Sequence, residues 1–332
     1  MADRPKTVLT HRVFPETVAM LEDWTDVFTN DGDVSFARDE VVERCRDAGA
    51  MMAFMPDSVD DAFLAQCPKL KIVACALKGY DNFDVEACTR RGVWVTIVDD
   101  LLTVPTAELA VGLLIGIARH VMTGDRAIRA GRFTAWQPTL YGMGIAGRTV
   151  GIVGMGRVGQ AIAQRMHGFD ATVLYADDQA LDPVTGVSLH LERAGFEELI
   201  CRADYIVLAT PLTAETLHLI DRGAIDMMKP GAILVNPGRG SVVDEIAVSN
   251  ALAEGQLAGY AADVFEFEDW ARLDRPREIP QSLLAQPEKT LFTPHIGSAV
   301  MDVRKAIEAE AATSILEALR GDRPTGAVNE VA

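Results

Sequence analysis

The chain has 332 residues, of which 49% are hydrophobic and 24% charged, a composition typical of a folded globular protein with room for two domains. Its 31 basic and 48 acidic residues give a formal net charge of −17, so nucleic acid and anionic membranes are not expected as partners. An anionic ligand would therefore need a local group of cationic side chains.

The five cysteines are odd in number and show no Cys-x-x-Cys spacing, which disfavours a disulfide framework. The first residues lead into a strand-like segment without a secretory apolar core. No apolar run approaches the roughly 20 residues that span a bilayer. We therefore expect a reduced, cytoplasmic location.

Short apolar segments alternate with amphipathic ones in the first part of the chain. Such alternation is typical of a parallel sheet covered by helices on both faces. A long helix is expected next, from Val104 to Arg129, with Pro105 in its first turn. The pattern predicts strands at 7–10, 50–55, 71–77 and 93–98, and helices near 38–47, 60–66 and 84–90.

The second part repeats this rhythm, and a last helix at 300–320, ended by Gly321, is expected to return to the first domain. The fold class predicted is α/β, with two Rossmann-like doubly wound parallel-sheet domains. Residues 1–100 plus 298–332 would form a discontinuous, flavodoxin-like substrate domain, and residues 101–297 an NAD-binding domain. The six strands expected in the second domain are 150–153, 172–176, 205–210, 232–236, 259–264 and 290–293.

A Gly-x-Gly-x-x-Gly turn follows the first strand of the second domain. Gly154 would allow the tight turn, Gly156 would let the backbone approach a pyrophosphate, and Gly159 would let the next helix pack closely on the sheet. The helix that begins near Arg157 and Val158 would point its amides at the phosphates. Flavin proteins and methyltransferases share this motif, so alone it predicts only a nucleotide-like ligand.

Asp177 follows the next expected strand at about the spacing of a ribose-binding carboxylate. Such a carboxylate accepts bonds from both adenosine hydroxyls and repels a 2′-phosphate, so NAD should be preferred over NADP. The alternative is that Asp177 and Asp178 simply open a solvated loop. With the preceding strand, Asp177 turns the glycine motif into a predicted NAD site.

Ligands of open α/β sheets bind beyond the carboxyl ends of the strands, so the residues after each strand are the candidates for chemistry. Three such loops contain Arg239, Glu268 and His295. Arg239 would bind two oxygens of an anion, while His295 moves a proton and Glu268 accepts a bond from its other ring nitrogen. Singly, a loop arginine is usually solvated and a histidine after a strand usually structural. Together they predict hydride transfer involving a small anion.

The chain resembles the D-2-hydroxyacid dehydrogenase superfamily in the glycine motif, Asn236–Glu245, Ala262–Glu266 and Thr293–Ser298. The resemblance covers nearly the whole chain. It implies that Arg239, Glu268 and His295 are catalytic, that Asp263 holds the nicotinamide carboxamide, and that Glu268 rather than Glu266 pairs with the histidine. The other cofactor-binding positions that it implies are Thr106, Pro211 and Gly238.

Within the superfamily the chain most resembles the phosphite (phosphonate) dehydrogenases, on Met52–Asp57, Ala76–Asp84, Asp100–Leu109 and Glu268–Arg272. Most hydroxyacid dehydrogenases have proline where this chain has Asp269. Two positions depart from the branch: Gly238 stands where cysteine or alanine is expected, and Asp177-Asp178 replace a glutamate and a small residue. The substrate-binding residues implied besides Arg239 are Lys78, Arg304, Gly79, Met55, Trp136 and Tyr141.

These features predict NAD-dependent oxidation of phosphite to phosphate, with water as the nucleophile and no metal. A phosphite dianion suits three cationic groups, whereas a single arginine is adequate for a carboxylate. Two alternatives stay open. One is a D-2-hydroxyacid dehydrogenase acting on a small 2-hydroxy or 2-keto acid, and the other an NAD-sensing scaffold similar to the C-terminal-binding-protein corepressors. The resemblance also implies a homodimer, formed through the helix at 104–129.

Overall fold

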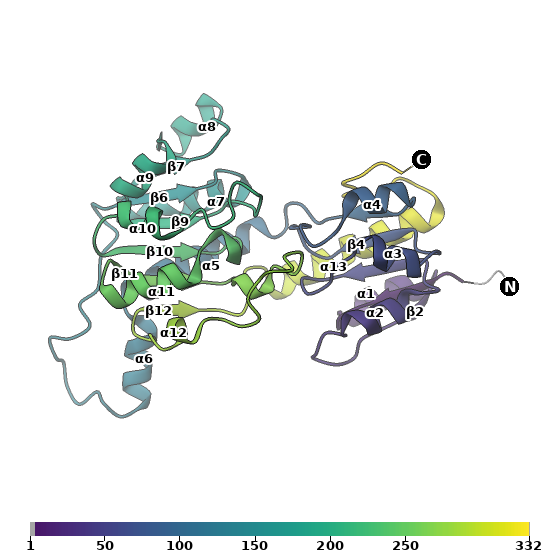
Figure 1. The fold of residues 1–332 in the computed structure, drawn as a ribbon, viewed down its shortest axis with the longest axis horizontal. Coiled ribbons are helices and arrows are strands. Elements are labelled where there is room, and N and C mark those ends of the chain that lie inside the picture. The colour runs from purple at the N-terminus through teal and green to yellow at the C-terminus, as the bar shows by residue number, and fades with distance from the viewer. Residues whose placement is uncertain (1–3, 332) are drawn as a thin grey trace. The chain divides into compact units, whose positions relative to one another are not determined.

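The computed structural model describes residues 4–331. The chain divides into two compact units (Figure 1). Unit 1 contains the residues up to Leu102, Trp270–Leu273 and the residues from Ser298 onward. Unit 2 contains Thr103–Asp269 and Asp274–Gly297. Each unit is built on one parallel sheet.

Unit 1 has a five-stranded sheet in the order β2-β1-β3-β4-β5, which is the order of flavodoxin-like folds. The register pairs Val8 with Met51 and Met51 with Val73, so buried apolar side chains lie side by side. The strands are β1 (Lys6–Leu9), β2 (Asp26–Phe28), β3 (Ala50–Ala53), β4 (Ile72–Cys75) and β5 (Trp94–Thr96).

Helices cover both faces of this sheet. The C-terminal helix α13 packs on β3 and β4, and its buried Ile307, Ala311 and Ile315 share a core with Leu9 and Met52. A return of the last helix to the first sheet was expected from the sequence. The helices of unit 1 are α1 (Pro15–Glu22), α2 (Arg38–Cys45), α3 (Asp61–Gln66), α4 (Val85–Arg90) and α13 (Met301–Arg320).

Unit 2 has a seven-stranded parallel sheet in the order β12-β11-β10-β9-β6-β7-β8. The chain moves outward from β6 to β8 and then returns to place β9 on the other side of β6. Ligands of such sheets bind at this reversal of strand order. The strands are β6 (Thr149–Val153), β7 (Thr172–Ala176), β8 (Leu191–Arg193), β9 (Tyr205–Leu208), β10 (Ala232–Asn236), β11 (Leu257–Ala262) and β12 (Thr290–Phe292).

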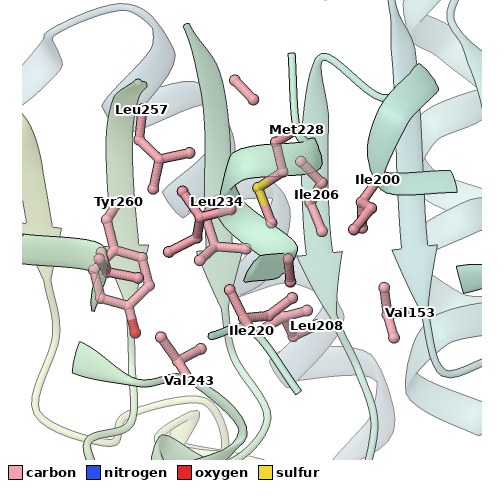
Figure 2. Close-up of a cluster of buried hydrophobic side chains, with 14 of the residues drawn as sticks. Val153, Ile200, Ile206, Leu208, Ile220, Met228, Leu234, Val243, Leu257 and Tyr260 are labelled. Carbon is pink, nitrogen blue, oxygen red and sulfur yellow. The ribbon is translucent and has the colours of Figure 1, made fainter. Parts of the chain in front are cut away.

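Apolar cores lie on both faces of this sheet. Figure 2 shows one of them, in which Ile206, Leu208 and Leu234 of the strands pack with Ile200 and Met228. The helices of unit 2 are α5 (Thr103–Ala118), α6 (Val121–Arg129), α7 (Arg157–Met166), α8 (Pro183–Ser188), α9 (Phe196–Arg202), α10 (Arg222–Met227), α11 (Glu245–Glu254) and α12 (Gln281–Leu284), with the short 3₁₀ helices η1 (His167–Phe169), η2 (Gly240–Val242) and η3 (Glu266–Glu268).

The predicted fold class is confirmed, but several elements differ from the expectation, among them helix α1, which was not expected. Strands β2 and β8 were not expected, because both are short segments that are partly exposed. The single helix expected at 104–129 is wrong: α5 and α6 are bent by 64° at a break. The cause is His120, whose φ of +53° is incompatible with a continuous right-handed helix.

Residues 119–142 form a segment that we call the arm. The arm extends α6 and the following loop away from the sheet of unit 2 (Figure 1). It closes on itself, because the amide of Met143 donates to the carbonyl of Ala118 at 2.9 Å. Among residues 4–331 no single helix is long and apolar enough to cross a membrane, although α5 and α6 taken together pass that test by length and composition.

Candidate functional site

The glycine loop lies at the carboxyl end of β6, beside the reversal of strand order. Gly154 has φ +91°, and a methyl group there would lie 2.6 Å from a carbonyl oxygen of the β9 loop. A methyl group on Gly159 would overlap the backbone of Gly154. Gly156 caps α7 without a side-chain bond and has open space on its Cβ side. Gly156 thus leaves room for a ligand beside the first turn of α7, at Arg157 and Val158, where a pyrophosphate would bind.

Asp177 lies directly after β7 and joins two loops. Its Oδ2 accepts a hydrogen bond from the amide of Met155 at 2.6 Å, and its Oδ1 accepts one from the amide of Gln179 at 2.8 Å. The carboxylate is therefore fixed beside the glycine loop, which differs from the alternative of a merely solvated turn. Each oxygen keeps a second lone pair for a ribose hydroxyl.

Asp263 follows β11 and is only 1% exposed. It accepts hydrogen bonds from the Thr293 hydroxyl at 2.6 Å and from the amides of Ile296 and Gly297 at 2.8 and 2.7 Å. Burial raises the pKa of Asp263, and these bonds oppose the rise. The Cβ side of Gly297 faces both Asp263 Oδ2 and Thr106 Oγ1. Two predicted cofactor-binding residues, Asp263 and Thr106, thus flank one glycine.

His295 and Glu268 form a close pair. The His295 Nδ1 lies 2.7 Å from Glu268 Oε2, and both side chains are about three-quarters buried, at 25% and 21% exposure. With Nδ1–H donating to the carboxylate, Nε2 is left to accept or give a proton. The other oxygen of Glu268 accepts from the amide of Phe265 at 2.9 Å. The structure thus brings together the two side chains that the sequence predicted to pair.

Arg239 lies in a loop that Asn236 holds from both sides. The Asn236 Nδ2 donates to the carbonyl of Arg239 at 2.8 Å, and its Oδ1 accepts from the amide of Gly238 at 3.1 Å. Two residues after Arg239, the amide of Ser241 donates to Asp269 Oδ2 at 2.8 Å. A methyl group on Gly238 would meet carbonyl oxygens of the β9 loop at 3.2 and 3.3 Å, so alanine or cysteine would need that loop to shift slightly.

Unit 1 brings two other predicted substrate residues together at the carboxyl end of β4. Lys78, followed by Gly79, has its Nζ 3.1 Å from Asp99 Oδ1. Arg304 on α13 donates from Nη1 to the carbonyl of Ala76 at 3.3 Å, in the loop that carries Lys78. Burial lowers the pKa of Arg304. Unit 1 therefore offers two cations within one small region.

The remaining predicted site residues are partly or largely exposed. Met55 is partly buried and packs on the core of unit 1. Trp136 and Tyr141 lie in the arm with 79% and 75% of their surface exposed, and Pro211 after β9 is exposed as well. Their contact with substrate or cofactor stays a prediction.

A buried cluster beside the Arg239 loop has no counterpart among the predicted functional residues. Glu245 and Glu266 are 0% and 6% exposed, and Glu266 Oε2 lies 2.8 Å from His218 Nε2. The acidic Asp244-Glu245 after the arginine loop was the available signal for Glu245. No local pattern points to His218, which lies in a polar loop far back along the chain.

The residues of unit 2 fit a nicotinamide dinucleotide. The open side of Gly156 suits a pyrophosphate, Asp177 a ribose, and the buried Asp263 the carboxamide end. His295 with Glu268 can move one proton. Hydride chemistry belongs to such a cofactor, because protein side chains do not accept hydride.

The comparisons with known proteins agree with a nicotinamide dinucleotide as the cofactor. The family model described as D-isomer specific 2-hydroxyacid dehydrogenase, NAD binding domain, matches residues 111–297. The chain is 37% identical over 332 residues to a glyoxylate reductase of Pyrococcus furiosus, covering 98% of this chain and 96% of that protein. A glyoxylate reductase of Pyrococcus horikoshii is also 37% identical, over 331 residues, with 98% and 96% covered.

Solved structures show the same fold. The TT0316 protein from Thermus thermophilus has a TM-score of 0.87 at 33% identity, covering 98% of this chain and 100% of that chain. An NADPH-dependent glyoxylate/hydroxypyruvate reductase from Sinorhizobium meliloti, in complex with NADP and malonate, has a TM-score of 0.83 at 27% identity, covering 98% and 97%. The chain therefore belongs to the D-isomer-specific 2-hydroxyacid dehydrogenase family and is an NAD-dependent dehydrogenase.

Proposed function

We propose that the chain oxidises phosphite to phosphate with NAD as the hydride acceptor. The observation that carries this proposal is the pair of cations in unit 1, Lys78 beside Asp99 and Arg304 beside Glu308, which are candidate anion ligands in addition to Arg239 of unit 2. Three cations match the three oxygens and nearly two charges of phosphite. Substituting each of the three cations in turn tests its part in phosphite binding.

In the proposed reaction, water adds to phosphorus and the electron pair of the P–H bond leaves as hydride. Phosphite, water and NAD⁺ thus give phosphate, NADH and one proton. NAD, when bound, supplies the hydride acceptor. Arg239, Lys78 and Arg304 hold the oxygens and offset the charge that develops on them. His295 Nε2 takes a proton from the water, and Glu268 holds the ring through Nδ1 and stabilises the imidazolium.

Asp269 gives further support. By the resemblance, most hydroxyacid dehydrogenases carry proline at this position, and the phosphite branch does not. The Asp269 carboxylate accepts the hydrogen bond from Ser241, next to the Arg239 loop. A proline side chain has no acceptor, so this attachment of the anion-binding loop depends on the aspartate.

The second candidate is the reduction of glyoxylate or another short 2-keto acid, and the named relatives favour it over phosphite oxidation. Arg239 would then bind the carboxylate, and His295 would protonate the keto oxygen as hydride is transferred from NADH. At 37% identity most positions differ from these relatives, and function depends on the site more than on the fold. This candidate gives Lys78 and Arg304 no necessary part in binding.

One set of assays decides between the candidates. NADH formation from phosphite and NAD is compared with NADH consumption on glyoxylate, hydroxypyruvate and pyruvate. A kcat/KM about 100-fold higher for phosphite is the expected result. Keto-acid reduction without phosphite-dependent NADH formation would establish the second candidate instead. Turnover of none of these substrates would refute both candidates.

We also propose that the chain forms a homodimer through the arm. Its exposed apolar side chains include Ile128, Phe133 and Trp136, which are 62%, 64% and 79% exposed. Apolar and aromatic side chains gathered in one segment are typical of a protein interface. The occupant is a second copy of this chain, in keeping with the homodimer that the resemblance implies.

Light scattering coupled to size exclusion tests the dimer. The double variant Ile128→Asp with Phe133→Asp should run as a monomer, because it places charges in the interface. The matched control is Val184→Asp on α8, a valine that is 78% exposed outside the arm. A wild-type monomer, or an equal effect of the control, would refute the arm interface.

A further inference from the structure

We infer that Glu266 is a positioning residue for the reaction: with Glu245 and His218 it clamps the loop that carries Arg239 onto the loop that carries Glu268. The three residues Glu245, Glu266 and His218 are called the clamp. The inference rests on the proposed function, because it concerns how the anion-binding arginine is held relative to the pair that moves the proton.

The two loops leave neighbouring strands and touch along their backbones. Asn236 at the end of β10 is in register with Ala262 at the end of β11. A methyl group on Gly240 would overlap the backbone of Phe265, so a residue with a side chain does not fit there. Arg239 directly precedes this contact. Its backbone position therefore depends on how firmly the two loops are joined.

Glu266 makes the joining bonds. Its amide donates to Glu245 Oε1 at 2.8 Å, and its own Oε1 accepts from the amide of Glu245 at 3.2 Å, so the start of α11 and η3 bind each other reciprocally. Its Oε2 lies 2.8 Å from His218 Nε2. The amide of His218 donates to the carbonyl of Ser241 at 2.8 Å. His218 therefore links Glu266 to the loop that carries Arg239.

The clamp places two carboxyl groups in a buried environment. Burial raises the pKa of Glu245 to about 8, with the charges of Glu266, Asp269 and Glu268 adding to the rise and its backbone bond with Glu266 opposing it. A protonated Glu245 avoids like-charge repulsion with the neighbouring acidic side chains. Among residues 4–331, Glu245 Oε2 has no hydrogen-bond partner. Apolar side chains would fill this space at lower cost, so the acids are better explained by the geometry that they impose.

The clamp connects directly to the catalytic pair. Phe265, which touches Gly240, donates its amide to Glu268 Oε1, and Glu268 Oε2 binds His295 Nδ1. One loop therefore carries both the contact with the arginine loop and the support of the histidine. Misplacement by about 1 Å can cost about 100-fold in rate.

The test compares Glu266→Gln and His218→Asn with the exposed control Glu288→Gln in the full-length protein. Steady-state kinetics use whichever substrate the wild type turns over, phosphite or glyoxylate. Glu266→Gln should raise the KM for the anion about 10-fold while the KM for NAD(H) changes less than about twofold. KM does not depend on the folded fraction, so loss of stability alone cannot produce this split. Hydrogen exchange over residues 237–243 should become faster.

His218→Asn is the second variant, for the case that Glu266→Gln does not fold. The His218 side chain is 36% exposed and its φ is +49°, a backbone conformation that asparagine tolerates. An anion KM within about twofold of the control, with unchanged exchange at 237–243, would overturn the clamp. If the wild type turns over no substrate, the proposed function fails, and exchange at 237–243 alone decides the clamp.

Discussion

The two units hold their candidate functional side chains in different ways. In unit 2, Asp263 accepts three hydrogen bonds and Glu268 accepts from both a backbone amide and His295. In unit 1, Lys78 pairs with one carboxylate, and the half-buried Arg304 donates to one carbonyl and has its Nη2 3.8 Å from Glu308 Oε1. The candidate residues of unit 2 are thus fixed by several hydrogen bonds to the backbone and to each other, whereas those of unit 1 are cations on long side chains with fewer such bonds.

The largest effect on activity should come from a substitution in unit 2, at His295. His295→Asn removes the proton-transfer group and should lower kcat about 1,000-fold. The Kd for NADH should change little, because the nucleotide residues Gly156 and Asp177 lie on other loops. Fluorescence titration and steady-state assays measure the two quantities. A near-normal kcat would remove His295 from the mechanism.

Lys78→Ala tests the part of the unit 1 cations in binding the substrate. Loss of one charge-assisted hydrogen bond should raise the KM for phosphite about 10- to 100-fold. The exposed Lys71, at the opposite end of β4, provides the matched control Lys71→Ala. An unchanged KM for phosphite would return the assignment to a 2-keto acid enzyme.

The preference for NAD over NADP tests a second residue of unit 2, Asp177. Asp177→Asn keeps an oxygen that can accept from the amide of Met155 but removes the charge that repels a 2′-phosphate. The ratio of kcat/KM for NADP to that for NAD should rise about 10-fold. If the wild type already uses both cofactors equally, the ribose assignment to Asp177 is wrong.

Stability against pH compares one buried acid in each unit. Burial raises the pKa of Glu245 to about 8 in unit 2 and that of Asp57 to about 6 in unit 1. The unfolded chain ionises near the ordinary values of 4.5 and 3.8, so each acid binds fewer protons after unfolding within its window. The free energy of unfolding should therefore fall as pH rises from 4.5 to 8 for Glu245, and from 3.8 to 6 for Asp57.

Urea unfolding at a series of pH values measures these slopes. Glu245→Gln should reduce the pH dependence of the unfolding free energy between pH 4.5 and 8. One proton accounts there for up to about 1.4 kcal/mol per pH unit. Asp57→Asn should reduce the pH dependence of the unfolding free energy only between pH 3.8 and 6. Parallel curves for wild type and Glu245→Gln would show that Glu245 titrates normally.

The smallest effect is expected from Gly238→Ala. The added methyl group would meet two carbonyl oxygens at 3.2 and 3.3 Å, a crowding that a small shift of the β9 loop relieves. The change in kcat/KM should stay below about threefold, and its sign shows whether the loop of Arg239 benefits from a bulkier neighbour. A loss of about 10-fold or more would mean that the β9 loop does not adjust.

The sequence predicted those parts of the fold that depend on local pattern. Buried strands such as β6 and β10 are continuous apolar runs, and the loops that follow them carry the predicted Gly154 and Arg239. The pairing of Glu268 with His295 followed from the family pattern. Strand β8 was not predicted, because Leu191–Arg193 is short and partly charged.

Features that arise from backbone conformation or distant contacts could not be read in this way. The break between α5 and α6 depends on the left-handed backbone of His120, which the neighbouring residues do not signal. The clamp joins His218 in a loop, Glu245 at the start of α11 and Glu266 at the start of η3. Hydrogen bonds between such residues appear only once the strands are ordered in the sheet.

The closure of the arm has a consequence for protein engineering. Its two ends meet at the bond between Ala118 and Met143, and a methyl group on Gly142 would overlap the backbone of Ala118. A segment whose ends are fastened together can be replaced by another of different length without displacing the scaffold. The arm is thus a candidate exchangeable module, and replacing it would alter the proposed subunit interface without changing the residues of the dinucleotide site.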